Sequence, residues 1–181
     1  MTAHIALLRA VNVGGKNLVS MAALKAMMEE LGFSGARSLL QSGNLIFDAG
    51  RRKPDALEAL LEKETEARFG VRPDYFVRAA AEWREIIAHN PFPREAEDDP
   101  ARLHVLALKA APSAVQVKAL RTAIKGPETF GTWTRHAYIY YPDGAGNSKL
   151  TPRQIETKLE TRGTARNWNT ALKLEALLRD S

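Results

Sequence analysis

The chain of 181 residues carries a formal net charge of +5, and its 45% hydrophobic and 26% charged residues are ordinary for a folded globular protein. It contains no cysteine, which excludes disulfides, thiolate metal ligands and cysteine nucleophiles. No basic segment precedes the first short apolar run, and no apolar stretch approaches the roughly 20 residues of a membrane helix. We therefore expect a cytoplasmic protein without a membrane partner.

The charge is unevenly distributed along the chain. Residues 1–100 hold 13 Lys or Arg and 15 Asp or Glu, whereas residues 101–181 hold 13 and 6. An excess of positive charge in the C-terminal half suits an acidic partner such as nucleic acid or a phosphorylated ligand. A solvated basic face without a partner would give the same composition.

The first 80 residues predict strands and helices in the order β, α, β, β, α, β. Apolar runs indicate the strands, and apolar residues spaced at i, i+3, i+4 and i+7 indicate the helices. The predicted strands span residues 4–11, 36–40, 45–48 and 75–77, and the predicted helices follow Ser20 and begin at Pro54. Because the strand at 4–11 is apolar on both faces, we expect it to be central in its sheet. The order predicts a ferredoxin-like α+β lobe, in which two helices cover one face of a four-stranded antiparallel sheet.

The second half is predicted to repeat this rhythm, without a repeat at the level of residues. Strands are expected at 103–109, 128–133 and 136–141, and helices after Ser113, from Thr151 to near Gly163, and from about Trp168 to the end. We thus predict a ferredoxin-like domain at 1–80, a connecting helix and linker loop at 81–100, and a second αβ domain with C-terminal helices at 101–181.

The loop after the first strand is the strongest candidate for a binding site. Two adjacent glycines can adopt positive φ and turn backbone N–H groups inward around an anion, while a lysine adds a point charge. The spacing does not match a P-loop, and the glycines could instead serve only to turn the chain. The candidate ligand-binding residues of this loop are Arg9, Asn12, Gly14, Gly15, Lys16 and Asn17.

Three further clusters share this amide-rich, basic character. Asparagine and glutamine bind sugars, bases and backbone, but they also stabilise turns and cap helices. Asn167 or Asn169 could cap the last helix, and Arg166 could hold a phosphate or form a salt bridge. The sequence leaves open whether the clusters meet in one pocket. The candidate residues are Gln41, Ser42 and Asn44, then Asn147 and Lys149, and then Arg166, Asn167 and Asn169.

Familiar catalytic constellations are missing from the sequence. The four histidines are scattered, so we expect no metal, and no cofactor is indicated. Ser42 lacks the surroundings of a nucleophile elbow. Tyr138 and Tyr140, with His136, could offer stacking surfaces to single-stranded nucleic acid, although a tyrosine-rich strand packed under a helix would have the same sequence.

Four motifs together resemble the bacterial family called domain of unknown function 1697. They are Leu7–Asn17, Gln41–Asn44, Asn90–Phe92 and Thr164–Thr170. The resemblance implies a bacterial, cytoplasmic αβ protein with a ferredoxin-like first domain. It implies no reaction, cofactor or catalytic residue. The family usually has Gly where this chain has Ala10.

Three functions are compatible with these observations. The first is a protein that binds a phosphate-bearing ligand, either a nucleotide or single-stranded nucleic acid. The second is an enzyme acting on a small anionic metabolite, which Arg9, Lys16 and Arg166 would orient. The third is an interaction module without chemistry. The sequence does not determine the oligomeric state.

Overall fold

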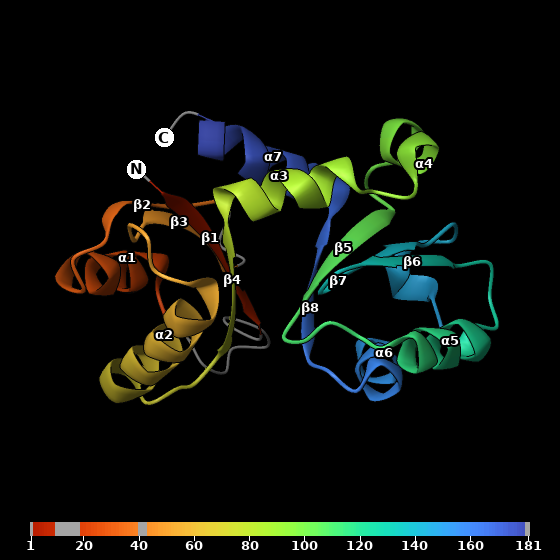
Figure 1. The fold of residues 1–181 in the computed structure, drawn as a ribbon, viewed down its shortest axis with the longest axis horizontal. Coiled ribbons are helices and arrows are strands. Elements are labelled where there is room, and N and C mark those ends of the chain that lie inside the picture. Colours follow the sequence, from red (N-terminus) through yellow and green to blue (C-terminus); the bar gives the residue numbers. More distant parts are fainter. Residues whose placement is uncertain (1, 10–18, 40–42, 180–181) are drawn as a thin grey trace. The chain divides into compact units, whose positions relative to one another are not determined.

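The computed structural model describes residues 2–9, 19–39 and 43–179. The chain is a mixed α/β protein, as the sequence predicted, and it has two four-stranded antiparallel sheets (Figure 1). It divides into two compact units, Met1–Arg84 with Leu174–Ser181, and Glu85–Lys173. The domain boundary predicted at residues 81–100 stays a prediction that limited proteolysis can test.

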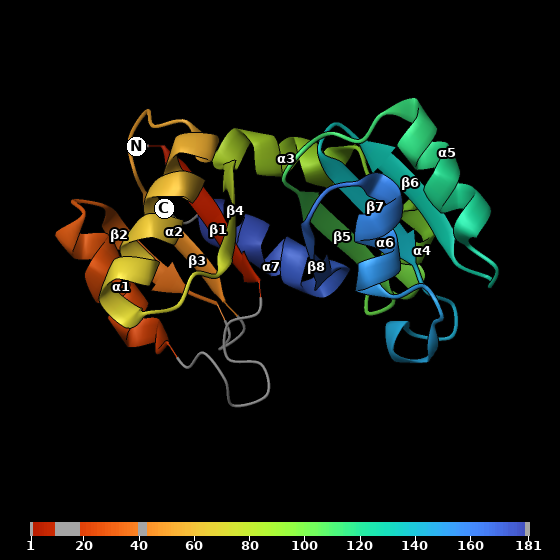
Figure 2. The same ribbon diagram turned by 90° about the horizontal axis from the view of Figure 1, so that it is seen from below.

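The first unit has the ferredoxin-like topology that the sequence predicted. Its strand order is β2-β3-β1-β4, which places β1 in the interior of the sheet. Helices α1 and α2 lie on one face and are seen in front of the sheet in Figure 2. The elements are β1 (Ala3–Arg9), α1 (Met21–Glu30), β2 (Ser34–Ser38), β3 (Asn44–Asp48), α2 (Pro54–Phe69), β4 (Asp74–Ala79) and the start of α3 (Ala80–Ala88), whose residues from Glu85 on belong to the second unit.

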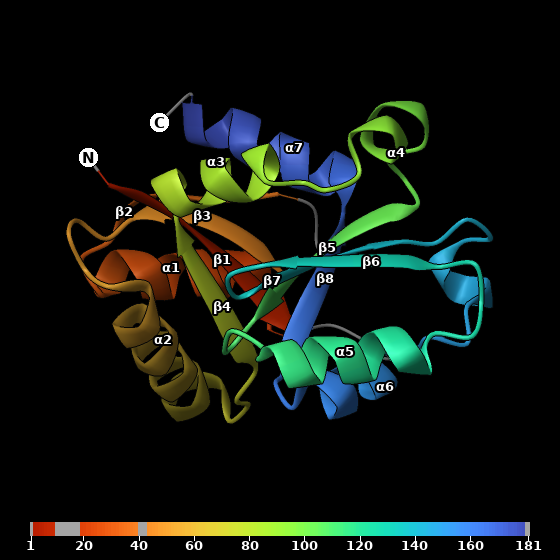
Figure 3. The ribbon, with the colours of Figure 1, turned by 45° about the vertical axis from the view of Figure 1, so that its right-hand side comes forward.

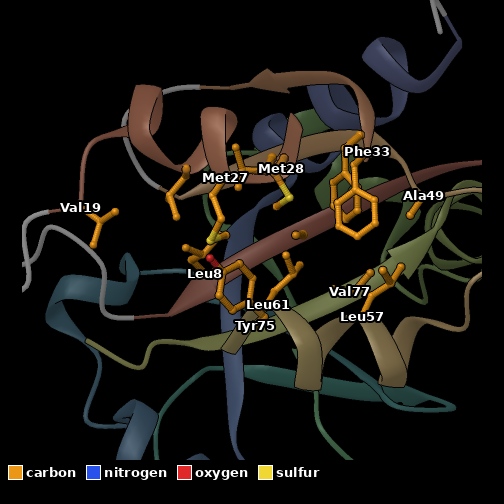
Figure 4. Close-up of a cluster of buried hydrophobic side chains, with 14 residues drawn as sticks. Leu8, Val19, Met27, Met28, Phe33, Ala49, Leu57, Leu61, Tyr75 and Val77 are labelled. Carbon is orange, nitrogen blue, oxygen red and sulfur yellow. The ribbon is translucent and has the colours of Figure 1, made fainter. Parts of the chain in front are cut away.

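The core of this unit buries both faces of β1. Ala6 and Leu8 face the helical layer, while Ile5 and Leu7 point to the other side, and all four are at most 3% exposed. The helical side packs Leu24, Met27 and Met28 of α1 against Leu57 and Leu61 of α2 and the strands (Figure 4). Burial on both faces is typical of a strand inside a sheet, although β4, at an edge of this sheet, is buried on both faces as well.

The second unit repeats the same topology. Its strand order β6-β7-β5-β8 is that of the first unit with each strand replaced by its counterpart. Figure 3 shows α5 and α6 side by side on one face of this sheet. The elements are α4 (Pro93–Asp98), β5 (Leu103–Leu108), α5 (Ala114–Ala123), β6 (Thr129–Trp133), β7 (His136–Tyr140), the 3₁₀ turn η1 (Ala145–Asn147), α6 (Pro152–Leu159), β8 (Gly163–Asn167) and the start of α7 (Trp168–Arg179), whose residues from Leu174 on belong to the first unit.

Two segments differ from the prediction. The helix expected to reach Gly163 ends at Leu159, and the next residues form the edge strand β8, which pairs with β5. β8 is short and polar, so its sequence lacks the apolar alternation that marks a strand. Within the run expected to be an irregular linker, Pro93–Asp98 forms the short helix α4, because proline at the first helical position has a suitable φ.

Backbone pairing shows which residue of the second unit corresponds to which residue of the first. Leu7 pairs with Asn44, and the Leu8 N–H donates to the Gly43 carbonyl at 2.8 Å. In the second unit, Ala107 pairs with His136 and the Leu108 N–H donates to the Arg135 carbonyl at 3.0 Å. Arg9 therefore corresponds to Lys109. The N-caps of the first helices, Ser20 and Ser113, also correspond, because each hydroxyl accepts the N–H three residues later.

Candidate functional site

Arg9, the first of the predicted site residues, ends the central strand of the first unit. Its Nη1 lies 3.7 Å from the Oδ2 of Asp74, the first residue of β4. The two side chains are 34% and 18% exposed. Because β1 and β4 are antiparallel, the end of one strand adjoins the start of the other. The ion pair therefore holds a partly buried guanidinium at this end of the sheet.

The start of β3 lies at the same end of the sheet. Gly43 is hydrogen-bonded to Leu8 and has φ of +74°. A Cβ added at Gly43 would lie 3.0 Å from the Leu8 Cβ, so glycine is favoured by both conformation and close approach. The Asn44 side chain is fully buried, and its Nδ2 donates to the Leu39 carbonyl at 3.0 Å. Asn44 thus ties the two sides of the β2–β3 hairpin together.

The residues that flank the two polar segments of the first unit meet at this end. Arg9 precedes one segment, and Leu39 and Gly43 flank the other, so both segments join the same end of one sheet. The residues that flank the loop and the hairpin are therefore adjacent in the sheet. The predicted site residues Asn12, Gly14, Gly15, Lys16, Asn17, Gln41 and Ser42 lie outside the described residues.

The predicted residues of the second unit have separate positions. Asn147 belongs to η1, where its Nδ2 donates to the Asp143 carbonyl at 2.9 Å, and Lys149 is exposed nearby. This turn follows β7, whose last residue pairs with Leu103 at the start of β5. Arg166 lies in β8 opposite Val105. The turn therefore follows the end of β7 that lies beside the start of β5, whereas Arg166 lies beside the middle of β5.

Arg166 has a partly desolvated guanidinium. Its Nη1 donates to the Thr164 hydroxyl at 2.9 Å and to the Ala165 carbonyl at 2.8 Å. Burial lowers the pKa of Arg166 to about 10, so the group remains a cation at neutral pH. Arg166 and Thr164 share one sheet face with Tyr138 and His136, because these residues lie in the cross-strand rows through Val105 and Ala107.

The residues after Arg166 begin the last helix. The Asn167 Oδ1 accepts the Thr170 N–H at 3.0 Å, which is the contact of an N-cap, and Asn169 is exposed. Trp168 is 4% exposed and packs 6.5 Å from the ring of Tyr138. Asn167 therefore caps the last helix, which is one of the two roles predicted for it. Trp168 belongs to the core.

The motif Asn90–Phe92 has a structural explanation. The Asn90 side chain accepts the Phe92 N–H at 3.0 Å and donates to the Phe92 carbonyl at 3.2 Å, which closes a local turn. Pro91 packs on β6, where a Cβ added at Gly131 would lie 2.8 Å from the Pro91 Cγ. The motif therefore docks the end of α3 on the second sheet.

Sequence reasoning missed two partners, Asp74 and Thr164. Both become visible only from strand register, since Asp74 lies opposite Arg9 and Thr164 lies on the same face as Arg166. The acidic residue at the start of a predicted strand was the available signal for Asp74. Thr164 stood in a quoted motif, but without β8 its orientation could not be assigned.

Comparison with known proteins identifies the family. The family model described as "Protein of unknown function (DUF1697)" matches residues 1–138. The chain belongs to this family. The DUF1697 match includes three of the four motifs, while Thr164–Thr170 lies beyond the matched residues. No curated protein matched the chain.

A solved structure shares the fold. The conserved bacterial protein SP0830 from Streptococcus pneumoniae is 21% identical, with a TM-score of 0.72, and the alignment covers 98% of each chain. At this identity the likeness concerns the fold, and it extends over both units. Within the part of the DUF1697 chain that the structure describes, no helix is long and apolar enough to span a membrane.

Proposed function

We propose that this protein binds a phosphate-bearing ligand, a nucleotide or single-stranded nucleic acid, at the end of the first sheet where β1 ends and β3 begins. The composition and the family resemblance also favour a bacterial, cytoplasmic setting. The ligand would contact the segment that follows Arg9, with Lys16 supplying charge and Gly14 and Gly15 supplying backbone N–H donors.

The length of the β1–α1 connection carries this proposal. Between Arg9 and the helix cap Ser20 lie ten residues, 10–19, whereas three residues, 110–112, separate the corresponding Lys109 and Ser113. The same strand-to-helix connection is thus closed with far fewer residues in the second unit. This topology therefore does not require the longer segment. A need to turn the chain does not explain why the segment contains two glycines.

The chemistry of this segment favours an anion. It brings two adjacent glycines, two asparagines and a lysine to a strand end that already holds Arg9. The second polar segment, with Gln41 and Ser42, joins the sheet at the same end and would add hydrogen-bonding groups. Backbone N–H groups and a lysine form the usual cradle for phosphate, while amides suit a base or a sugar.

A loop-shortened variant tests the proposal. Residues 10–18 are replaced by Ala-Ala, which copies Ala110-Ala111 of the second unit. Val19 is retained because it is 3% exposed and belongs to the core, and it corresponds to Pro112 before Ser113. Since loop length has a small effect on closure entropy, the variant should fold with similar stability.

The readout is the thermal shift produced by a panel of nucleotides and a single-stranded oligonucleotide, because a ligand that prefers the native state raises its melting temperature. We expect at least one compound to stabilise the unmodified protein and to lose its effect in the shortened variant. A ligand that stabilises both proteins equally would contradict the assignment, as would a panel without any effect on the unmodified protein.

A further inference from the structure

The outer helical layer of the second unit, formed by α5 and α6, is basic. Lys118 and Arg121 on α5 are three residues apart, so they share one side of the helix, and Lys125 follows just after the end of α5. All three are exposed, and α5 contains no Asp or Glu. Among the residues that the structure describes, no carboxylate forms an ion pair with any of the three.

Helix α6 extends this positive surface. Arg153 and Lys158 are exposed on it, and α5 and α6 pack side by side (Figure 3). The carboxylates nearby have other partners: the Glu156 Oε1 accepts the Gly163 N–H at 2.9 Å, and the Glu160 Oε2 accepts from the Gln116 amide at 3.0 Å. The basic helical layer, defined as the exposed surface of α5 and α6, therefore has cations in excess.

The first unit shows that the fold does not require this charge. Its corresponding helix α1 has one lysine, Lys25, and ends with two glutamates, and α2 carries five acidic residues against Lys63 and Arg68. Two copies of one topology thus have helical layers of opposite charge. The imbalance between the two halves of the sequence arises largely from these layers.

We propose that the basic helical layer docks the phosphodiester backbone of nucleic acid. The surface offers long cationic side chains and very little apolar anchorage, since Val115 is the one exposed large hydrophobic residue among the described residues of α5 and α6. Protein partners are usually held by aromatic and apolar anchors in the centre of an interface. A nucleic-acid backbone needs only cations, and it is bound without regard to sequence.

This surface goes beyond the proposed function, because it lies on helices of the second unit and uses none of the residues of the segment after Arg9. It would add sequence-independent affinity for a polymer, which a free nucleotide could not exploit. The two proposals can therefore fail separately.

The test measures fluorescence anisotropy of labelled 20-nucleotide random-sequence single strands and duplexes over a range of salt concentrations. The double variant Lys118→Glu/Arg121→Glu is compared with the matched control Lys25→Glu/Lys63→Glu on α1 and α2, in which Lys25 occupies the position that corresponds to Lys118. Melting temperatures of both variants show that each is folded.

We expect the α5 variant to bind at least about 10-fold more weakly at low salt, with a log–log salt slope reduced by about 2, since each phosphate contact contributes about 0.9. The control should bind like the unmodified protein. Equal affinity of the two variants would overturn the proposal, and so would poly-glutamate competing as well as DNA, which would indicate an acidic protein partner.

The loop-shortened variant separates this outcome from the proposed function. If it binds oligonucleotides normally while the α5 variant does not, the basic helical layer is the docking surface. If the loop-shortened variant alone loses oligonucleotide binding, the phosphates contact the segment after Arg9 and the inference about the helices is wrong.

Discussion

The Glu58 carboxylate accepts the backbone N–H of Val77 at 2.8 Å along the outer edge of β4. The same oxygen lies 3.3 Å from the Nη1 of Arg78, whose side chain is fully buried. One helical turn later, Glu62 accepts the Tyr75 N–H at 3.1 Å. Helix α2 thereby covers an edge that would otherwise offer free N–H groups to another strand.

Replacing Glu58 should destabilise the protein strongly. Glu58→Ala leaves a buried guanidinium with less compensation, although Glu82 still lies 3.4 Å from the Arg78 Nε, and we expect a loss of about 3 kcal/mol in the free energy of unfolding. The free energy of unfolding is measured by urea denaturation. The control is Glu66→Ala, which removes the exposed pair with Arg72 and should cost less than about 1 kcal/mol. Similar losses of stability in both variants would show that the buried Glu58–Arg78 pair contributes no more to stability than the exposed Glu66–Arg72 pair.

His4 should make stability depend on pH. It is 1% exposed, and its Nε2 lies 3.2 Å from the Arg52 carbonyl. Burial lowers the pKa of His4 below 6.5, against the opposing effect of that carbonyl. Because the unfolded chain then binds the proton more readily, stability is complete above pH 6.5 and is lost as the pH falls from 6.5 towards the lower folded-state pKa.

The measurement is the free energy of unfolding at pH 7.5 and pH 5.5, for the unmodified protein and His4→Phe. The difference between the two pH values should be smaller in the variant. Part of it should persist, because burial also lowers the pKa of His104. An undiminished difference in His4→Phe would show that His4 is not the group responsible.

Asn167 and Asn169 should differ in their effect on stability. Asn167→Ala removes the contact with the Thr170 N–H and should cost about 1 kcal/mol, the usual effect of losing an N-cap. Asn169 is exposed in the first turn of α7, so Asn169→Ala should change stability by no more than about 0.5 kcal/mol. Thermal unfolding of both variants checks this, and a smaller loss for Asn167→Ala than for Asn169→Ala would contradict the capping role.

The sequence predicted the first unit well because its signals are local. The apolar strand at Ala3–Arg9, the cap at Ser20 and the first-turn Pro54 each determine an element from neighbouring residues. β8 was missed because only Thr164 of its five residues is buried and its pairing with β5 is long-range. Without β8, the second half showed only a repeated order of strands and helices, which was not enough to predict a second ferredoxin-like unit.

The candidate site was predictable in composition but not in geometry. Amides, glycines and basic residues marked the loops, whereas the Arg9–Asp74 pair and the Leu8–Gly43 hydrogen bond depend on strand register. Register also allowed the two connections after β1 and β5 to be compared. That comparison shows that the connection after β1 is much longer than its counterpart after β5.

The central claim is that the segment after Arg9 holds a phosphate-bearing ligand, and Lys16→Ala tests it most directly. The affinity of the variant is measured for the nucleotide or oligonucleotide that gives the largest thermal shift with the unmodified protein, with Lys63→Ala, an exposed lysine of α2, as control. We predict unchanged stability and a loss of one charge-assisted hydrogen bond, about 1.5 to 3 kcal/mol, or roughly 10-fold to 100-fold in affinity. Unchanged affinity in a folded Lys16→Ala protein would contradict the claim.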